Sequence, residues 1–323
     1  MPLMYRPTRA ADLNACLALI PEGPLFDDAM RPGLLRLWRE VLARRCAESA
    51  VIYDGKRLPG SQIVGFGLSV FVTEEFAHEA KTQLPPYIDK HVLDRWARGC
   101  SPLLDLDAIR EANSGAGLHL LIMHHGVMED SLTPDEVSQA RILLFDAFRA
   151  YHRGYRLKDF IDEVYGEAQL ERYTARGPRL YTDYEAFFRS GAVPPPPLGR
   201  HPYLIGTTRA EALAREGTYA FEVFSYVPPR FHFAPEEQEL LHHALLGLTD
   251  AELGRTLHAA LATVKKRWAS IYDRVASIDP DLLLGAAEAV PPEGRRGPEK
   301  RRRLLGYLRQ HLEELRPVKP LRS

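Results

Sequence analysis

The sequence is poor in cysteine and contains no long hydrophobic run. Among its 323 residues are three cysteines, Cys16, Cys46 and Cys100, which are widely spaced and form no CxxC pair. This spacing favours buried, reduced thiols over disulfides or a zinc site. No uninterrupted apolar segment approaches the roughly 20 residues that span a bilayer, and no early basic stretch precedes an apolar one. We therefore expect a cytoplasmic protein with no membrane partner.

An excess of one charge is also absent. The chain has 42 Lys and Arg against 43 Asp and Glu, a formal net charge of -1 at pH 7. Bulk charge therefore does not indicate a nucleic-acid partner, and any such binding must come from local clusters. The length, with 45% hydrophobic residues, is sufficient for two domains with ordinary cores.

Nucleotide-binding glycine loops and a Ser-His-Asp pattern are absent too. His124 and His125, with His119 and Glu129 nearby, have the chemistry of zinc or iron ligands. Neighbouring strand residues point to opposite faces, so the pair cannot easily share one ion, and we expect no metal. Tyr165 and Tyr173 are candidate acids of an acetyltransferase, although most tyrosines in such positions are core or rim residues. No catalytic residue is assigned from the sequence.

Residues 233–275 are the most informative stretch, because they predict three short helices. The first has an apolar stripe at helical spacing and ends at Gly247, where a left-handed cap is expected. Thr249 and Glu252 then form a capping box that begins a second helix. Leu253 and Leu257 provide the buried side of that second helix.

The third helix, beginning near Leu261, has two different faces. Its apolar face consists of Val264, Trp268, Ile271 and Val275. Its other face consists of Thr263, Lys266, Arg267 and Ser270, with Lys265 at the flank. One face can pack while the other is free to meet phosphates and base edges. A basic helix taken alone is most often a solvated surface, but the three-helix context favours DNA.

This stretch resembles the helix-turn-helix domain of LuxR-type transcriptional regulators. The matching residues are Phe233, Pro235, Glu237, Gly247, Glu252, Leu253, Leu257, Thr263, Val264, Lys265 and Ile271. The resemblance implies that the third helix enters the major groove of double-stranded DNA, where Thr263, Lys265, Lys266 and Arg267 make contact. Ala259 and Ala260 depart from the family pattern, and loss of the helix cap should cost about 1 kcal/mol.

The C-terminal tail combines basic residues with a leucine pattern. Arg295, Arg296 and the run from Lys300 to Arg303 surround the start of a predicted helix. The leucines that follow at spacings of three and four are Leu305, Leu308, Leu312 and Leu315. They predict either pairing with a second copy, as in a homodimer, or packing on the same domain.

The first two hundred residues alternate between strand and helix patterns, which predicts an α/β domain. The expected strands are 4–7, 50–54, 62–72, 118–123, 157–164, 179–183, 201–207 and 218–226. The expected helices are 8–13, 34–45, a helical insertion over 85–112, 134–152, 168–176 and 209–215.

The opening segment from Tyr5 to Leu13, together with Tyr173 and Gly177, resembles the GNAT acetyltransferases. That resemblance implies a mixed sheet with flanking helices. GNAT enzymes hold the diphosphate of acetyl-CoA in a glycine-containing loop at a helix N-terminus. Here the corresponding segment, 124–136, has one glycine and the acids Glu129, Asp130, Asp135 and Glu136. We therefore expect no cofactor, and a domain that senses a small-molecule ligand or serves assembly.

The predicted organisation has three parts. Residues 1–228 form the GNAT-like domain, 229–290 a small all-α helix-turn-helix domain, and 291–323 a basic tail with a C-terminal helix. The prolines 194–197 are interpreted as a stiff linker. The predicted function is a sequence-specific transcriptional regulator. An acetyltransferase whose C-terminal helices recruit a partner remains the alternative, and a sigma-like domain that also contacts RNA polymerase is a third hypothesis.

Overall fold

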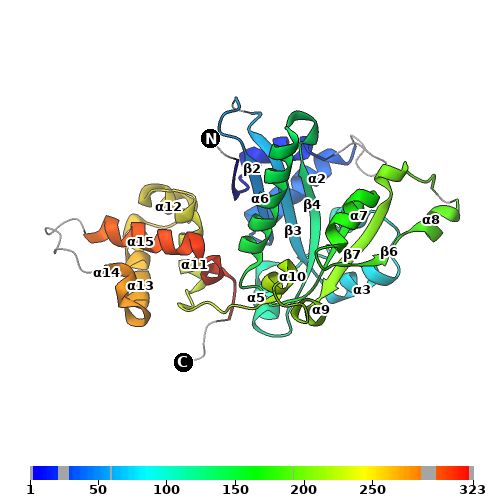
Figure 1. Cartoon of the computed structure of the whole chain (residues 1–323). Coiled ribbons are helices and arrows are strands. Elements are labelled where there is room, and N and C mark those ends of the chain that lie inside the picture. Colours follow the sequence, from blue (N-terminus) through cyan, green and yellow to red (C-terminus); the bar gives the residue numbers. More distant parts are fainter. Residues whose placement is uncertain (1–2, 21–28, 59, 192, 285–295, 320–323) are drawn as a thin grey trace. The chain divides into compact units, whose positions relative to one another are not determined.

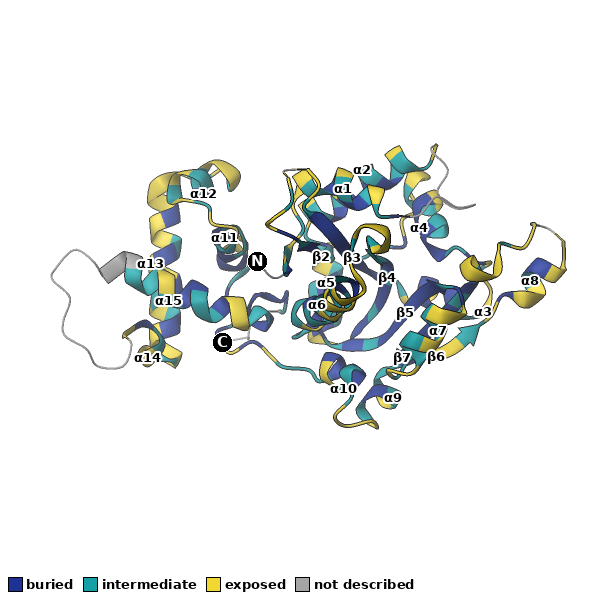
Figure 2. Ribbon diagram, turned by 45° about the horizontal axis from the view of Figure 1, so that its top comes forward, coloured by how far each residue is buried: buried dark blue, intermediate teal, exposed yellow. Residues whose placement is uncertain are grey.

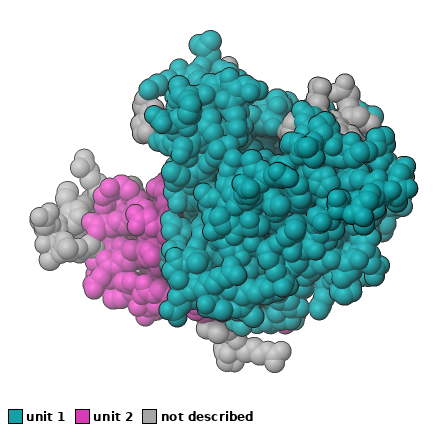
Figure 3. Space-filling model, turned by 45° about the vertical axis from the view of Figure 1, so that its right-hand side comes forward, with its two compact units in different colours: residues 1–226 teal, residues 227–323 magenta. Residues whose placement is uncertain are grey.

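The computed structural model describes residues 3–20, 29–58, 60–191, 193–284 and 296–319. The chain divides into two compact units, residues 1–226 and 227–323 (Figure 3). Each unit has its own hydrophobic core. The boundary expected at 290/291 falls on residues outside the described part.

A seven-stranded mixed sheet forms the centre of the first unit (Figure 1). The order in the sheet is β1-β2-β3-β4-β5-β7-β6, and all neighbours are antiparallel except β4 and β5, which are parallel. The strands are β1 Met4–Pro7, β2 Ala47–Tyr53, β3 Ile63–Val72, β4 Leu118–Val127, β5 Leu157–Tyr165, β6 Arg179–Thr182 and β7 Pro202–Thr208.

Helices cover both faces of this sheet. Successive residues of β2 belong to different clusters, because Val51 packs with α1 and α2 whereas Ile52 packs with Ala140 of α6. The central strands are therefore almost wholly buried (Figure 2), which explains their nearly continuous apolar sequence. The helices are α1 Leu13–Ala18, α2 Arg31–Ala43, α3 Glu74–Thr82, α4 Ile88–Ala97, α5 Leu106–Ser114, α6 Pro134–His152, α7 Glu167–Thr174, α8 Glu185–Arg189, α9 Arg209–Leu213 and α10 Tyr219–Phe224, with the 3-10 turns η1 Ala10–Asp12, η2 Glu129–Ser131 and η3 Leu198–Arg200.

Three expectations for this unit are wrong. The segment 218–226, rich in aromatic and β-branched residues, forms helix α10 because the Thr218 side chain caps it and its buried residues follow helical spacing. Prolines 194–197 are not an interdomain linker, since β7 follows them and lies between β5 and β6 in the sheet. Cys100 is exposed, whereas Cys16 and Cys46 are buried as expected.

Within the described residues, the second unit contains helices and no strand. They are α11 Pro235–Leu245, α12 Asp250–Thr256, α13 Leu261–Ile278, α14 Pro280–Leu284, α15 Arg296–Gln310 and the turn η4 Leu312–Leu315. The predicted end of the first helix and the predicted starts of the second and third are confirmed. Gly247 follows α11 with φ +90°, and Thr249 and Glu252 form the predicted capping box of α12.

The leucines of the tail pack on their own unit. Leu305, Leu308 and Leu315 are buried in the same cluster as Trp268 of α13. Arg301 donates to Asp250 Oδ1 at 2.6 Å and lies over the Trp268 ring, while the neighbouring arginines Arg302 and Arg303 pair with Glu299. These contacts favour packing of the tail on its own domain over pairing with a second copy. No helix in the part of the chain that the structure describes has the length and apolarity needed to cross a bilayer.

Candidate functional site

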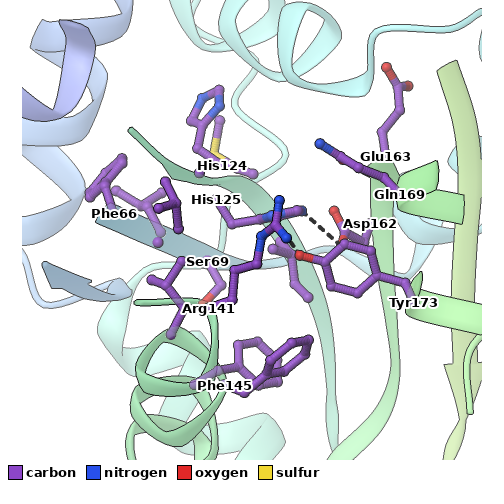
Figure 4. A pocket seen from close by; sticks show the side chains of 18 of the residues that line it. Phe66, Ser69, His124, His125, Arg141, Phe145, Asp162, Glu163, Gln169 and Tyr173 are labelled. Atoms are coloured by element: carbon purple, nitrogen blue, oxygen red, sulfur yellow. Dashed lines mark hydrogen bonds and ion pairs between the residues drawn. The ribbon is translucent and has the colours of Figure 1, made fainter. Parts of the chain in front are cut away.

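The two parallel strands of the sheet separate part-way along their length. Residues 118–122 of β4 pair with residues 157–162 of β5. Beyond Ile122, β4 continues to Val127 beside β3, and β5 continues to Tyr165 beside β7. A cavity of about 600 Å³ opens there, and α6 and α7 contribute further lining residues (Figure 4).

Three polar side chains form a hydrogen-bonded chain in this cavity. His125 Nε2 lies 3.2 Å from Asp162 Oδ2, and His125 Nδ1 lies 3.0 Å from the Tyr173 hydroxyl (Figure 4). In neutral His125 the Nε2–H can donate to the carboxylate while Nδ1 accepts from the phenol. The strand β5 supplies Asp162, β4 supplies His125 and α7 supplies Tyr173. The chain therefore spans the gap between the separated strands.

Burial and charge set the protonation states of these hydrogen-bonded side chains. Burial lowers the pKa of His125. The charge of Asp162 and the hydrogen bond from His125 to Asp162 raise it by more, so the pKa of His125 lies above its usual value. Burial and the nearby Asp162 charge raise the pKa of Tyr173. Tyr173 therefore remains a neutral phenol that can donate a proton, and His125 is a basic imidazole that can accept one.

Two more carboxyl groups are buried beside Asp162. Glu163 accepts from the Tyr87 and Ile88 amides at 2.7 and 3.1 Å, and so caps α4, and it also accepts from the Tyr165 hydroxyl at 2.8 Å. Burial raises the pKa of Glu163 to about 7. Burial, then the charges of Glu163 and Asp162, raises the pKa of Asp89 well above its usual value.

The two adjacent histidines face different partners. His124 Nδ1 lies 3.2 Å from Asp89, whereas His125 contacts Asp162. Burial lowers the pKa of His124 to about 3, so its contact with Asp89 is a hydrogen bond of a neutral imidazole and not an ion pair. Among the described residues, no three His, Cys, Asp or Glu side chains gather in an arrangement that could hold a metal ion.

The N-terminus of α6 does not fit the diphosphate of the acetyl-CoA that the GNAT resemblance implies. Pro134 has no N–H, and the Glu136 and Val137 amides already donate to Thr133. The Glu136 carboxylate accepts in turn from the Thr133 amide at 3.0 Å. Glu129 and Asp130 line the adjoining part of the cavity. Internally satisfied amides and several carboxylates would oppose an incoming diphosphate.

Sequence reasoning noted His125 and Tyr173 singly but missed Asp162 and Glu163. One available signal was the adjacent acids Asp162 and Glu163 between the apolar residues Ile161 and Val164 of β5, because acidic residues are rarely buried without a partner. Nothing in the sequence shows that α7 brings Tyr173 to His125, since that contact joins residues 48 positions apart.

In the second unit, α13 presents most of the predicted DNA-binding residues. Thr263, Lys265 and Lys266 are exposed. Arg267 is half-buried, and Ser270, although exposed, donates to Glu237 Oε1 at 2.7 Å. The opposite face is buried through Val264, Trp268, Ile271 and Val275.

The residues predicted to shape these helices occupy the same unit. Leu253 is buried and Leu257 packs against the core. Glu237 is buried and also pairs with Arg274 at 3.0 Å, so it joins α11 to α13. Ala260 stands at the N-cap of α13 and provides no side-chain bond to it.

Comparison with known proteins gives structural similarity only. No family model matches the sequence, and no curated protein matches it significantly. An acetyltransferase related to histone acetyltransferase HPA2 from Corynebacterium glutamicum aligns with 64% of this chain and 97% of its own, at 12% identity and a TM-score of 0.36. The spermidine/spermine N-acetyltransferase of Vibrio cholerae aligns with 67% of this chain and 97% of its own, at 10% identity and a TM-score of 0.36.

A third similar structure is the C-terminal condensation domain of Ebony in complex with beta-alanyl-dopamine, which covers 64% of this chain and 99% of its own at 12% identity and a TM-score of 0.41. Similarity at this level says nothing about activity. The strand order, with its single parallel pair that separates, is observed in this chain itself and does not depend on these comparisons. The mixed sheet with its flanking helices fits the GNAT-like fold that the N-terminal sequence resembles.

Proposed function

We propose that the first unit is an N-acyltransferase of the GNAT type, which binds a small amine where β4 and β5 separate. The observation that carries this proposal is the chain from Asp162 through His125 to Tyr173. A base oriented by a carboxylate and in contact with a proton donor is the arrangement that general acid–base catalysis needs. The cavity beside it provides room for a small molecule.

The three residues have distinct roles in such a reaction. An amine that attacks an acyl thioester forms a C–N bond and breaks the C–S bond, which releases a thiol. The ammonium form loses one proton to solvent before attack, and the nitrogen loses a second one afterwards. His125 would accept this second proton, with Asp162 stabilising the imidazolium. Tyr173 would donate its proton to the leaving sulfur and regain one from His125.

The donor is proposed only as an acyl thioester, because the N-terminus of α6 does not fit a diphosphate. If the protein does not bind the diphosphate, acetyl-pantetheine, which lacks this group, should be as good a donor as acetyl-CoA. A comparison of KM for the two donors with the full-length protein measures this. A much lower KM for acetyl-CoA would show that the diphosphate is bound somewhere in the chain.

The activity itself is tested by mass spectrometry of mixed amines incubated with each donor. We expect acylated products with wild-type protein and their loss with His125→Gln. Leu58→Gln, a change at an exposed position that does not line the cavity, serves as the control. Absence of product from every donor and amine, or equal rates with His125→Gln, would reject the assignment.

A second proposal, that the second unit binds double-stranded DNA as a dimer, is favoured by α13. Thr263, Lys265 and Lys266 project from one exposed face while the opposite face is anchored in the core. A helix anchored in this manner can enter a major groove. The cavity of the first unit would then hold an inducing ligand. Selection from a random duplex pool should retain a paired motif, and no retention even at low salt would contradict DNA binding.

A further inference from the structure

Three arginines line the cavity that holds the buried acids. They are Arg141 of α6, Arg172 of α7 and Arg176, which lies just after the end of α7. Burial and the Asp162 charge raise the pKa of Tyr173, and the charges of all three arginines oppose that rise. Figure 4 shows Arg141 beside His125 and Tyr173. All three arginines therefore line the cavity and act electrostatically on its phenol.

Only one of these arginines has an acidic partner. Arg141 pairs with Glu129, and its side chain is 30% exposed. In the described portions of the chain, no ion pair includes Arg172 or Arg176. Arg176 lies over the Phe145 ring, 5.0 Å from its centroid, and donates to the Arg172 carbonyl. Two positive charges without a carboxylate thus border the more accessible part of the cavity.

Asp162 provides the opposite charge at the buried end. The residue is 3% exposed, and its Oδ2 is occupied by His125. Its Oδ1 is buried and has no hydrogen-bond partner among the described atoms. A buried carboxylate oxygen without a partner is unfavourable, and an ammonium group would satisfy it.

We propose that the amine bound in this cavity is a zwitterion, an amino acid or a similar small molecule that carries both an ammonium and a carboxylate. The ammonium would bind Asp162 Oδ1, and the carboxylate would bind Arg172 and Arg176, whose guanidinium groups suit carboxylates in a two-bond geometry. The apolar walls formed by Leu144, Phe145 and Phe148 suit an apolar side chain. This inference rests on the proposed function and specifies its acceptor.

The test compares each amino acid with the amine that lacks its carboxylate. L-Phenylalanine and 2-phenylethylamine are the first pair, followed by the other apolar amino acids and their amines, each titrated into the full-length protein by calorimetry. We expect at least one amino acid to bind on the order of tenfold more tightly than its amine, the change that one additional polar contact can give. The double variant Arg172→Gln, Arg176→Gln should abolish that difference. Arg189→Gln, an exposed arginine on α8 paired with Glu185, is the matched control and should preserve it.

The outcomes separate this inference from the function on which it rests. If amines bind as tightly as amino acids and the double variant changes neither, the zwitterion is wrong while amine binding stands. If no amine and no amino acid binds, both proposals fail. If inorganic phosphate or coenzyme A binds wild-type protein but not the double variant, and no amino acid binds, the arginines serve the donor and the zwitterion is again wrong.

Discussion

At the scale of single residues, Glu163 links the stability of the first unit to pH. Its folded pKa is about 7, against an ordinary 4.5, mainly because of burial. Between these values the folded protein retains a proton that the unfolded chain releases, so stability falls as pH rises from about 4.5 to about 7. The loss is on the order of 3 kcal/mol, since one pKa unit corresponds to about 1.4 kcal/mol.

Glu163→Gln should flatten this dependence, because the amide does not ionise yet can still accept from the Tyr87 and Ile88 amides. Urea unfolding of both proteins at pH 5 and pH 8 measures the change in free energy of unfolding. Wild type should lose more stability than the variant at the higher pH. Equal losses would mean that Glu163 does not carry this effect.

Tyr173→Phe tests the phenol without opening the core. The hydroxyl contacts His125 in a cavity, so its removal should change stability by no more than about 1 kcal/mol. Acyl transfer should fall on the order of a hundredfold or more, as for loss of a general acid. Tyr219→Phe, which removes another cavity hydroxyl that donates to the Phe145 carbonyl, is the control. Equal rates for the two variants would exclude Tyr173 as the proton donor.

Residue types alone identify part of this site. His125 and Tyr173 stand out in the sequence because their side chains can transfer protons. Asp162 does not, because its function depends on the separation of β4 from β5, and that separation is a property of strand pairing. Likewise, only the folded chain shows that the Glu136 and Val137 amides at the start of α6 donate to Thr133.

At the scale of elements, α13 lacks the cap that its position calls for. Ala260 has the extended backbone of an N-cap residue, φ -62° and ψ 150°, but no side-chain oxygen. Ala260→Ser should let the hydroxyl accept from an amide of the first turn and stabilise the second unit by about 1 kcal/mol. Thermal or urea unfolding measures the gain, with Ala262→Ser inside the helix as control. A gain no larger than that of the control would show that the cap is satisfied otherwise.

Helices with clear caps are predicted well, and short ambiguous segments are not. The Thr249–Glu252 capping box locates the start of α12 in the sequence, and the structure confirms it. The segment 218–226 is different, because its aromatic residues suit either a strand or a helix. Packing of Ala220, Val223 and Phe224 against their cluster decides for the helix.

At the scale of the whole molecule, the DNA-binding proposal depends on exposed charge in the second unit. Lys266 is exposed, and no ion pair of the described chain includes it. If it contacts a phosphate, Lys266→Ala should weaken binding to all duplexes and lower the salt slope by about one. If it reads a base, the loss should be confined to one position of the selected motif. Fluorescence anisotropy over a range of salt distinguishes these results, and unchanged binding to specific and nonspecific duplexes removes Lys266 from the interface.

The two-part organisation follows from composition and pattern, and the boundary expected after residue 228 lies two residues from the division between the compact units. The prolines 194–197 suggest a linker by their stiffness, yet the sheet requires β7 after them, and the compact units meet at residues 226 and 227. Strand order is decided by long-range pairing, which local sequence does not encode.

The most direct test of the central claim is the affinity of Asp162→Asn for an amine. The substitution preserves size but removes the buried charge that the ammonium is proposed to meet. In calorimetric titrations at pH 7.5, the account predicts that the tightest-binding amine loses on the order of tenfold or more in affinity, while the folded state is retained. Equal affinity of wild-type protein and Asp162→Asn for that amine would contradict the assignment of this cavity as an amine site.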